Sequence, residues 1–237
     1  MQTAVQLVYP PRCLACGGLV DSDFGLCAEC WRETPFIAGL VCDLCGTPLP
    51  GASDRAEHCD ECLRIARPWA QGRAALLYEG TARRMVLALK HGDRQDIVAP
   101  AVRWMAMAAR PILRPEMIVV PIPLHLRRLV ARRYNQSALL ARALAVSEGL
   151  EWSADALVRT AHTPKLDGRS RDDRFAMLDG VLRPHPRRGG VLRGREVLLV
   201  DDVMTTGATF AAAAEACHAA GATRVSVAAM ARVAKDA

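Results

Sequence analysis

Two adjacent aspartates stand directly before a threonine-rich turn in the segment VLLVDDVMTTGAT. Asp201 and Asp202 end an apolar run that is typical of a buried strand. Ligands of open α/β sheets bind beyond the carboxyl ends of the strands, and the free N–H groups of a helix start attract anions. We therefore expect a ribose 5-phosphate, with its hydroxyl groups at the aspartates and its phosphate in the turn. The predicted phosphate-binding residues are Thr205, Thr206, Gly207, Ala208 and Thr209.

Two plainer interpretations of this segment compete with the first. It can be an ordinary strand, turn and helix in which a threonine caps the helix, and this interpretation remains open. It can also be a Walker B strand, but the sequence contains no G-x-x-x-x-G-K-[ST] loop to accompany one.

The cysteines form a second pattern with chemical meaning. Eight of the nine precede residue 63 and form four C-x-x-C pairs. The short spacer lets both sulfurs of a pair bind one tetrahedral ion, so two pairs complete one zinc site. We predict two structural zinc ions and prefer sequential pairing, while crossed pairing remains open. The predicted ligands are Cys13, Cys16, Cys27, Cys30, Cys42, Cys45, Cys59 and Cys62.

Disulfides and redox-active pairs are the alternatives to zinc. The sequence starts without a signal-peptide pattern, so we expect a cytoplasmic protein, and a reducing compartment disfavours disulfides. A redox C-x-x-C normally occurs once, beside a βαβ unit. His58 could replace a ligand, but four cysteines in each half make it unnecessary. Cys217 lies among alanines and is predicted to be a packed thiol.

An α/β scaffold is predicted to position these groups. After Pro68 the cysteine pattern stops, and short apolar runs alternate with helical segments, which indicates a mostly parallel sheet. We expect Thr81 to cap the first of these helices and Gly92 to end it. Residues 159–195 are predicted to form a long loop with a short hairpin. The predicted domains are residues 1–66, a double zinc ribbon, and residues 67–237.

Composition favours polyanionic partners without proving them. The chain has 237 residues, 51% of them hydrophobic, and a formal net charge of +6. Such a charge suits nucleic acids or phosphorylated small molecules, and a merely arginine-rich surface explains it equally well. The most apolar stretch, MIVVPIPLHL, is too short to span a bilayer, so no membrane insertion is expected.

The segment VLLVDDVMTTGAT resembles the PRPP-binding motif of type I phosphoribosyltransferases. The cysteine-rich start, LKHGD and VVPIPLHLRRLVARRYNQS, followed by that motif, together resemble the ComF family over nearly the whole chain. The resemblance implies a Rossmann-like α/β sheet behind a zinc ribbon. It also implies a site for PRPP with Mg²⁺, and a link to DNA uptake and natural transformation.

Particular residues correspond to the family motifs. Asp201 and Asp202 match the ribose-binding acidic pair, which we take as catalytic. Arg127, Arg128 and Arg132 fall on the pyrophosphate side. Lys90 and its neighbour His91 match a family motif without an assigned role. The family's T-x-x-Q segment has no glutamine in TPKLDGRSRDDRF, so the acceptor side of the site is not specified.

Three classes of function follow. The first is a phosphoribosyltransferase, a glycosyltransferase whose acceptor is unknown. The second is a non-catalytic protein that binds PRPP or a nucleotide. The third is a competence factor that contacts single-stranded DNA or a DNA-uptake helicase, and it is compatible with either of the others. Aromatic residues make up only 5% of the chain, which provides few platforms for stacking single-stranded bases.

Overall fold

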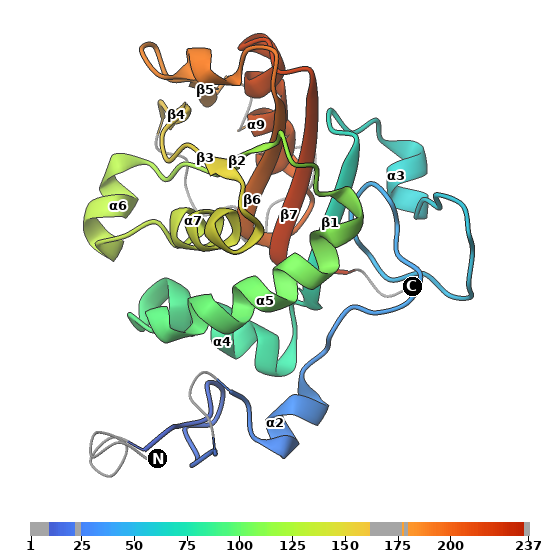
Figure 1. Cartoon of the computed structure of the whole chain (residues 1–237), viewed down its shortest axis with the longest axis vertical. Coiled ribbons are helices and arrows are strands. Elements are labelled where there is room, and N and C mark those ends of the chain that lie inside the picture. Colours follow the sequence, from blue (N-terminus) through green and yellow to red (C-terminus); the bar gives the residue numbers. More distant parts are fainter. Residues whose placement is uncertain (1–9, 22–24, 162–176, 178–179, 235–237) are drawn as a thin grey trace.

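A five-stranded parallel sheet forms the centre of the molecule (Figure 1). The computed structural model describes residues 10–21, 25–161, 177 and 180–234. Neighbouring strands follow the order β1-β7-β6-β2-β3, and every pairing is parallel. The predicted α/β sheet is therefore confirmed. Its strands are β1 (Gln71–Leu77), β2 (Ile118–Pro121), β3 (Glu151–Trp152), β6 (Glu196–Met204) and β7 (Arg224–Arg232).

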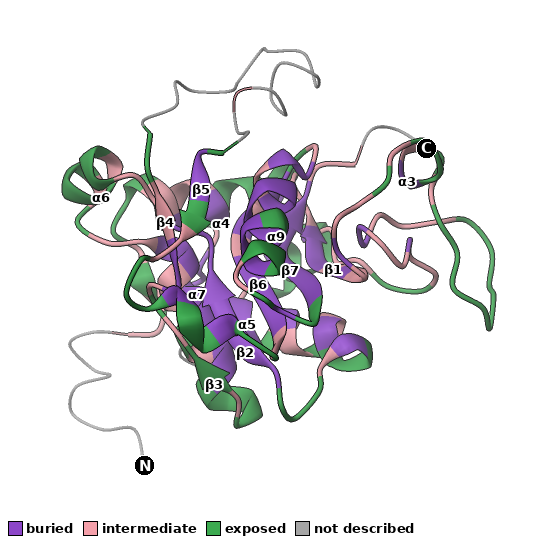
Figure 2. Cartoon of the chain, turned by 90° about the horizontal axis from the view of Figure 1, so that it is seen from above, coloured by how far each residue is buried: buried purple, intermediate pink, exposed green. Residues whose placement is uncertain are grey.

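Helices cover both faces of this sheet. On one face, Leu198 and Val200 of β6 pack in a cluster with residues of α4 (Gly80–His91), α5 (Val98–Ala109) and α7 (Gln136–Glu148). On the other, Leu199 packs with residues of α9 (Ala208–Ala219). Figure 2 shows the resulting buried strands between these layers. Burial on both faces explains why β6 is apolar without alternation up to its aspartates.

Shorter elements surround this centre. The antiparallel strands β4 and β5 form the small sheet that we expected near residues 159–195. Residues 162–176, which include part of that loop and the segment TPKLDGRSRDDRF, lie outside the described part of the chain. The remaining elements are α2 (Ala28–Glu33), α3 (Asp60–Arg64), η1 (Gln95–Ile97), η2 (Arg110–Ile112), α6 (Leu126–Arg132), β4 (Leu157–Arg159), β5 (Leu182–Pro184) and η3 (Gly189–Leu192).

One local prediction differs from the structure. Thr81 does not cap α4, because the helix already begins at Gly80 and Glu79 occupies the capping position. Gly92 does end that helix, as expected. The segment that was assigned to the pyrophosphate side contains the helix α6, which His125 caps by accepting a hydrogen bond from the Arg127 amide. Among the described residues, no helix is long and apolar enough to cross a membrane.

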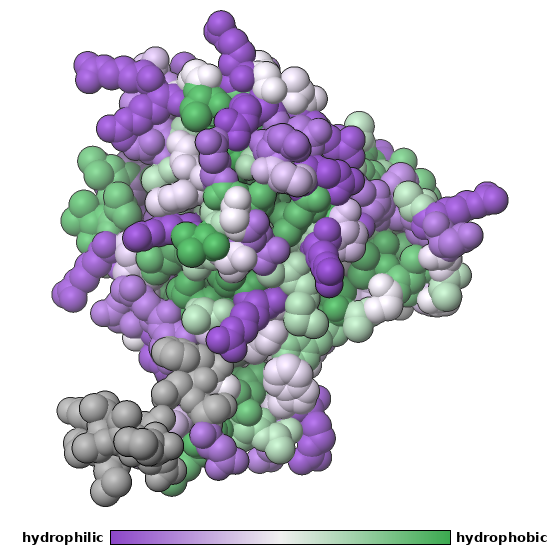
Figure 3. Space-filling model, in the orientation of Figure 1, coloured by the Kyte–Doolittle hydropathy of each residue, from purple (hydrophilic) through white to green (hydrophobic). Residues whose placement is uncertain are grey.

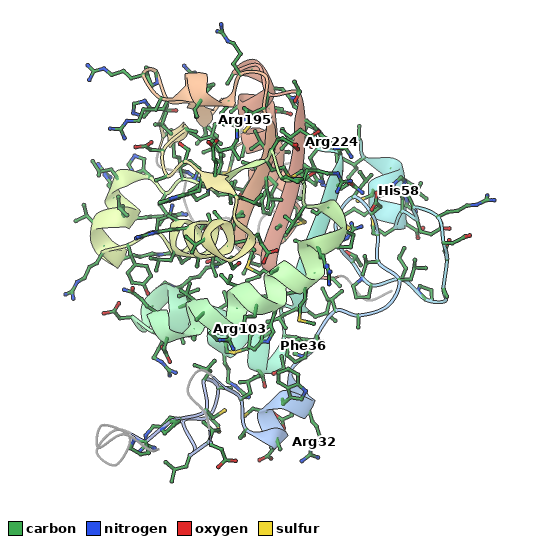
Figure 4. The ribbon with its side chains drawn as sticks, in the orientation of Figure 1. Arg32, Phe36, His58, Arg103, Arg195 and Arg224 are labelled. Atoms are coloured by element: carbon green, nitrogen blue, oxygen red, sulfur yellow. The ribbon has the colours of Figure 1, made fainter. Side chains whose placement is uncertain are left out.

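The segment around the first four cysteines and the segment around the second four pack against different parts of the α/β unit. They are called the first and the second half of the cysteine-rich region. Leu14, near the first four cysteines, lies in the same cluster as the residues of α4 and α5. Phe36, which is labelled in Figure 4, contacts the rings of Trp31 and Trp104. The second half packs beside β1, where Trp69 donates a hydrogen bond to the Leu44 carbonyl at 2.6 Å. Hydrophobic core is therefore shared across the predicted domain boundary after residue 66.

Replacing Gly72 with alanine tests this packing. A Cβ atom there would collide with the Leu44 carbonyl oxygen of the second ribbon and lie 2.9 Å from a methyl carbon of Val227. Because one of these neighbours is backbone, we expect Gly72→Ala to lower the free energy of unfolding by about 2–3 kcal/mol. Urea denaturation measures the change.

Gly190→Ala is the matched control. A Cβ atom at Gly190 has no heavy atom within 4 Å, so this variant should unfold like the wild type. Equal stability of the two variants would contradict the close approach of the ribbon to β1.

Candidate functional site

The strand β6 brings both aspartates to the carboxyl edge of the sheet. Both carboxylates meet helices that cover the Leu198 and Val200 face of the sheet. Asp202 contacts Lys90 at the end of α4, and Asp201 contacts Ser137 at the start of α7. The acidic pair is thus enclosed between the strand end and two helix ends.

Asp202 is buried and only half satisfied. Its side chain is 5% exposed, and its Oδ1 atom lies 3.2 Å from the ammonium nitrogen of Lys90 at the end of α4. Its Oδ2 atom is buried and has no hydrogen-bond partner among the described residues. A buried carboxylate oxygen without a donor is costly, so this atom is suited to accept a hydrogen bond from a ligand.

Asp201 is held by the start of α7. Its Oδ1 atom accepts hydrogen bonds from the Ser137 hydroxyl at 2.6 Å and from the Asp202 amide at 2.9 Å. Asn135 caps this helix by accepting from the Ser137 amide at 3.0 Å, which fixes the position of the serine. Burial and then the charge of Asp202 raise the pKa of Asp201 to about 7. The Arg159 guanidinium on β4 acts on the same carboxylate.

The turn after β6, residues 205–207, is called the phosphate loop below. Gly207 has a φ angle of +82°, a conformation that side chains disfavour, and it leads into α9. The Thr206 hydroxyl accepts a hydrogen bond from the Ala208 amide at 3.4 Å, and Thr205 is exposed. Ala208 and Thr209 form the first turn of α9. The predicted residues thus share one helix start, close in sequence to the aspartates.

The three predicted arginines all lie on α6. Arg132 lines a pocket of about 300 Å³ together with Lys90, the residue that pairs with Asp202. Arg128 acts electrostatically on Arg159 and helps to lower the pKa of that group, after the larger effect of burial. Arg127 is exposed. All three predictions remain untested as ligand contacts.

The cysteines gather as two clusters with sequential pairing, as preferred from the sequence. Within each cluster the four sulfurs lie within 4.8 Å of one another, which fits one tetrahedral zinc ion. His58 is exposed and belongs to neither cluster (Figure 4). Cys217 is buried as predicted, and burial raises its pKa to about 12. The clusters are Cys13, Cys16, Cys27 and Cys30, and Cys42, Cys45, Cys59 and Cys62.

Three residues near the aspartates were missed or left without a role by the sequence analysis. Lys90 stood in a noted motif, but only the fold shows that the end of α4 meets Asp202. Ser137 follows Asn135 by two residues, a spacing that indicates a helix cap and could have located it. Arg159 lies in a segment that we expected to be a loop, and no sequence signal pointed to it.

The parallel sheet, the acidic strand end and the glycine-led helix start define a phosphoribosyltransferase-like protein that carries zinc ribbons. Comparison with known protein families gives the same result. Residues 4–63 match the double zinc ribbon domain, and residues 153–237 match the phosphoribosyl transferase domain. The second match contains both aspartates and the phosphate loop.

Full-length relatives identify the family. DNA utilization protein YhgH of Salmonella typhimurium is 30% identical over 228 residues, which cover 93% of this chain and 96% of the relative. Competence protein F of Haemophilus influenzae is 28% identical over 204 residues, 84% of this chain and 86% of the relative. The chain belongs to the family of these two proteins, and the resemblance to ComF is confirmed. The crystal structure of TT1426 from Thermus thermophilus is a distant likeness, with 19% identity, coverage of 58% of this chain and 83% of that one, and a TM-score of 0.34.

The raised pKa of Asp201 predicts a pH-dependent stability. The folded state holds this proton more tightly than the unfolded state, whose aspartate titrates near 3.8. The resulting stabilisation is full below pH 3.8 and is lost as pH rises through about 7. We therefore expect Asp201→Asn to be more stable than the wild type by about 2 kcal/mol at pH 8 and by much less at pH 5.

Chemical denaturation at both pH values measures this difference. Glu215→Gln serves as the control, because it removes a charge from an exposed position of α9 without touching the site. A constant difference between Asp201→Asn and the wild type at both pH values would contradict the assignment.

Proposed function

We propose that this protein binds PRPP, as its magnesium complex, at the carboxyl end of β6. Asp201 and Asp202 face the ribose hydroxyl groups, and the 5-phosphate lies in the phosphate loop. Thr205, Thr206 and Thr209 add hydroxyl donors to the backbone amides of that loop. The zinc ions have a structural role.

The observation that supports this proposal most directly is the buried Oδ2 atom of Asp202. It has no hydrogen-bond donor among the described residues, although its partner oxygen is held by Lys90. A ribose hydroxyl is a neutral donor of suitable size for such an acceptor. The neighbouring helix start attracts the phosphate of the same molecule, because α9 is long enough to have an appreciable dipole.

Lys90 and Arg132 are assigned to the pyrophosphate end. They line one pocket, which gives two cations within reach of a single polyanion. Binding of pyrophosphate would draw Lys90 from Asp202 and free a second carboxylate oxygen for the ribose. Mg²⁺, when bound, neutralises charge on the pyrophosphate oxygens and keeps several of its waters.

If the protein is a transferase, the bond between C1 of the ribose and pyrophosphate breaks as a nucleophile attacks C1. Both electrons of the broken bond leave with the pyrophosphate, where cations stabilise them. The aspartates favour the positive charge that develops at the ribose. The nucleophile is not assigned, because the family's glutamine is missing from the segment TPKLDGRSRDDRF.

Calorimetry with PRPP and Mg²⁺ tests the binding site. Asp202→Asn removes the charge without changing the size, and Thr206→Val removes a hydroxyl donor. A hydrogen bond to a charged group contributes about 1.5–3 kcal/mol, so each variant should bind about 10- to 100-fold more weakly than the wild type.

Glu215→Gln is again the control and should bind PRPP like the wild type. Absence of binding to the wild type, or wild-type affinity in both site variants, would refute the proposal. Release of pyrophosphate with a panel of bases then separates a transferase from a non-catalytic PRPP-binding protein.

A role in DNA handling is the second candidate. The relatives are named for DNA utilization and competence. Figure 3 shows long hydrophilic side chains projecting at the end of the molecule that carries β5. The exposed arginines of this region include Arg183, Arg187, Arg188 and Arg193.

Phosphate contacts of this kind predict salt-dependent binding of single-stranded DNA. We expect the affinity to fall at least about 10-fold between 50 and 200 mM salt, because arginines that neutralise phosphates release counterions. Charge reversal by Arg187→Glu and Arg188→Glu should weaken binding further. Affinity that stays constant with salt would exclude this surface as a phosphate-binding one.

A further inference from the structure

Two buried arginines join the phosphate loop to the second zinc ribbon. Arg67 donates a hydrogen bond to the carbonyl oxygen of Thr206 at 2.8 Å, and Arg232 donates to that of Thr205. The two guanidinium-bearing side chains are only 1% and 2% exposed. The backbone carbonyl groups of the phosphate loop thus accept hydrogen bonds from two arginines that have almost no contact with water.

The same arginines contact the ribbon at their other atoms. Arg232 donates to the Thr47 hydroxyl at 3.0 Å and to Glu61 at 3.3 Å. Arg67 forms an ion pair with Glu61 at 3.5 Å, and Glu61 is the chain neighbour of the zinc ligand Cys62. Thr47 in turn accepts a hydrogen bond from Cys45 at 3.1 Å. Each arginine is therefore connected to a zinc ligand through one intervening residue, Thr47 or Glu61.

Packing reinforces this connection at Gly207. A Cβ atom there would lie 3.0 Å from the Trp69 ring and 3.1 Å from the Arg67 guanidinium. The Arg67 guanidinium also stacks over Trp69, 5.3 Å from the ring centre. Trp69 is fixed to the ribbon by its hydrogen bond to Leu44 and lies against Phe210 of α9. The phosphate loop therefore packs against Trp69 and Arg67, and Trp69 is in turn bound to the ribbon.

Zinc is expected to hold the ribbon side of this arrangement in place. Four cysteine ligands on one ion fix the ribbon segments that carry Leu44, Thr47 and Glu61, which Trp69, Arg232 and Arg67 contact. Structural zinc sites contribute directly to folding, so loss of zinc from the second cluster would release these segments. Arg67 and Arg232 would then lose their partners in the ribbon and hold the loop less firmly.

We propose that Arg67 and Arg232 are positioning residues that make the conformation of the phosphate loop depend on zinc in the second cluster. The first cluster, which packs on the α4 side, does not control the loop. The consequence for ligand affinity rests on the proposed function. The order of the ligand-free loop does not, and it provides an independent measurement.

Paired cysteine variants separate the two zinc sites. Cys27 and Cys59 are the third ligands of their clusters, and each occupies the capping position of a short helix. Cys27→Ser and Cys59→Ser should each lower the zinc content. Only Cys59→Ser should raise amide hydrogen exchange of residues 205–208 in the ligand-free protein, by about 10-fold. Equal exchange in the two variants would overturn the proposal.

Arginine variants with both zinc sites intact give a second test. Arg67→Met removes the charge but keeps an unbranched side chain. Arg73→Met is the matched control, because Arg73 binds Asp43 of the same ribbon at 2.7 Å and does not touch the loop. We expect faster loop exchange and about 10-fold weaker PRPP binding in Arg67→Met alone, with partial rescue in Arg67→Lys.

The outcomes of this second test remain distinguishable. If the wild type does not bind PRPP, the proposed function fails, while loop exchange in Arg67→Met still decides the present inference. If Arg67→Met retains wild-type loop exchange with its zinc content unchanged, the arginine does not position the loop.

Discussion

A charged group that is removed from water needs a partner, and this requirement explains the arrangement around β6. The strand is buried along its apolar length and ends in two carboxylates. One of them meets Lys90 at the end of α4, and the other meets Ser137 at the start of α7. These helix ends supply donors for the strand end while leaving one oxygen of Asp202 without a partner among the described residues. The same strand thus forms the core and the candidate site.

The same requirement accounts for the intimate packing of the second zinc ribbon. Two arginines are buried between the ribbon and the loop that follows β6, and both bind Glu61. Glu61 supplies negative charge that such buried guanidinium groups require. The ribbon is consequently part of the support for the α/β unit, and its cysteines Cys42, Cys45 and Cys62 lie in the same hydrophobic cluster as α9.

Features encoded locally could be predicted from the sequence. The apolar run of β6, the glycine that leads into α9 and the spacing of the cysteines each fix structure over a few residues. Contacts between distant segments could not be predicted. Lys90 and Asp202 meet only because the fold brings the end of α4 to the end of β6. Arg232 was not singled out, because its partners Thr47 and Glu61 lie far from it in the sequence. The cap of α4 was misassigned to Thr81, because the helix begins at Gly80 and its capping position is Glu79.

The contacts of Arg232 have a consequence for the order of events during synthesis. Thr47 precedes Arg232 by 185 residues, and Glu61 precedes it by 171. The cysteine-rich region, residues 1–66, emerges from the ribosome first. The contacts of Arg232 with the ribbon can form only after β7, the last strand, has been translated and has joined the sheet. A chain that lacks the last strand would therefore lack the Arg232 contacts that join the loop to the ribbon.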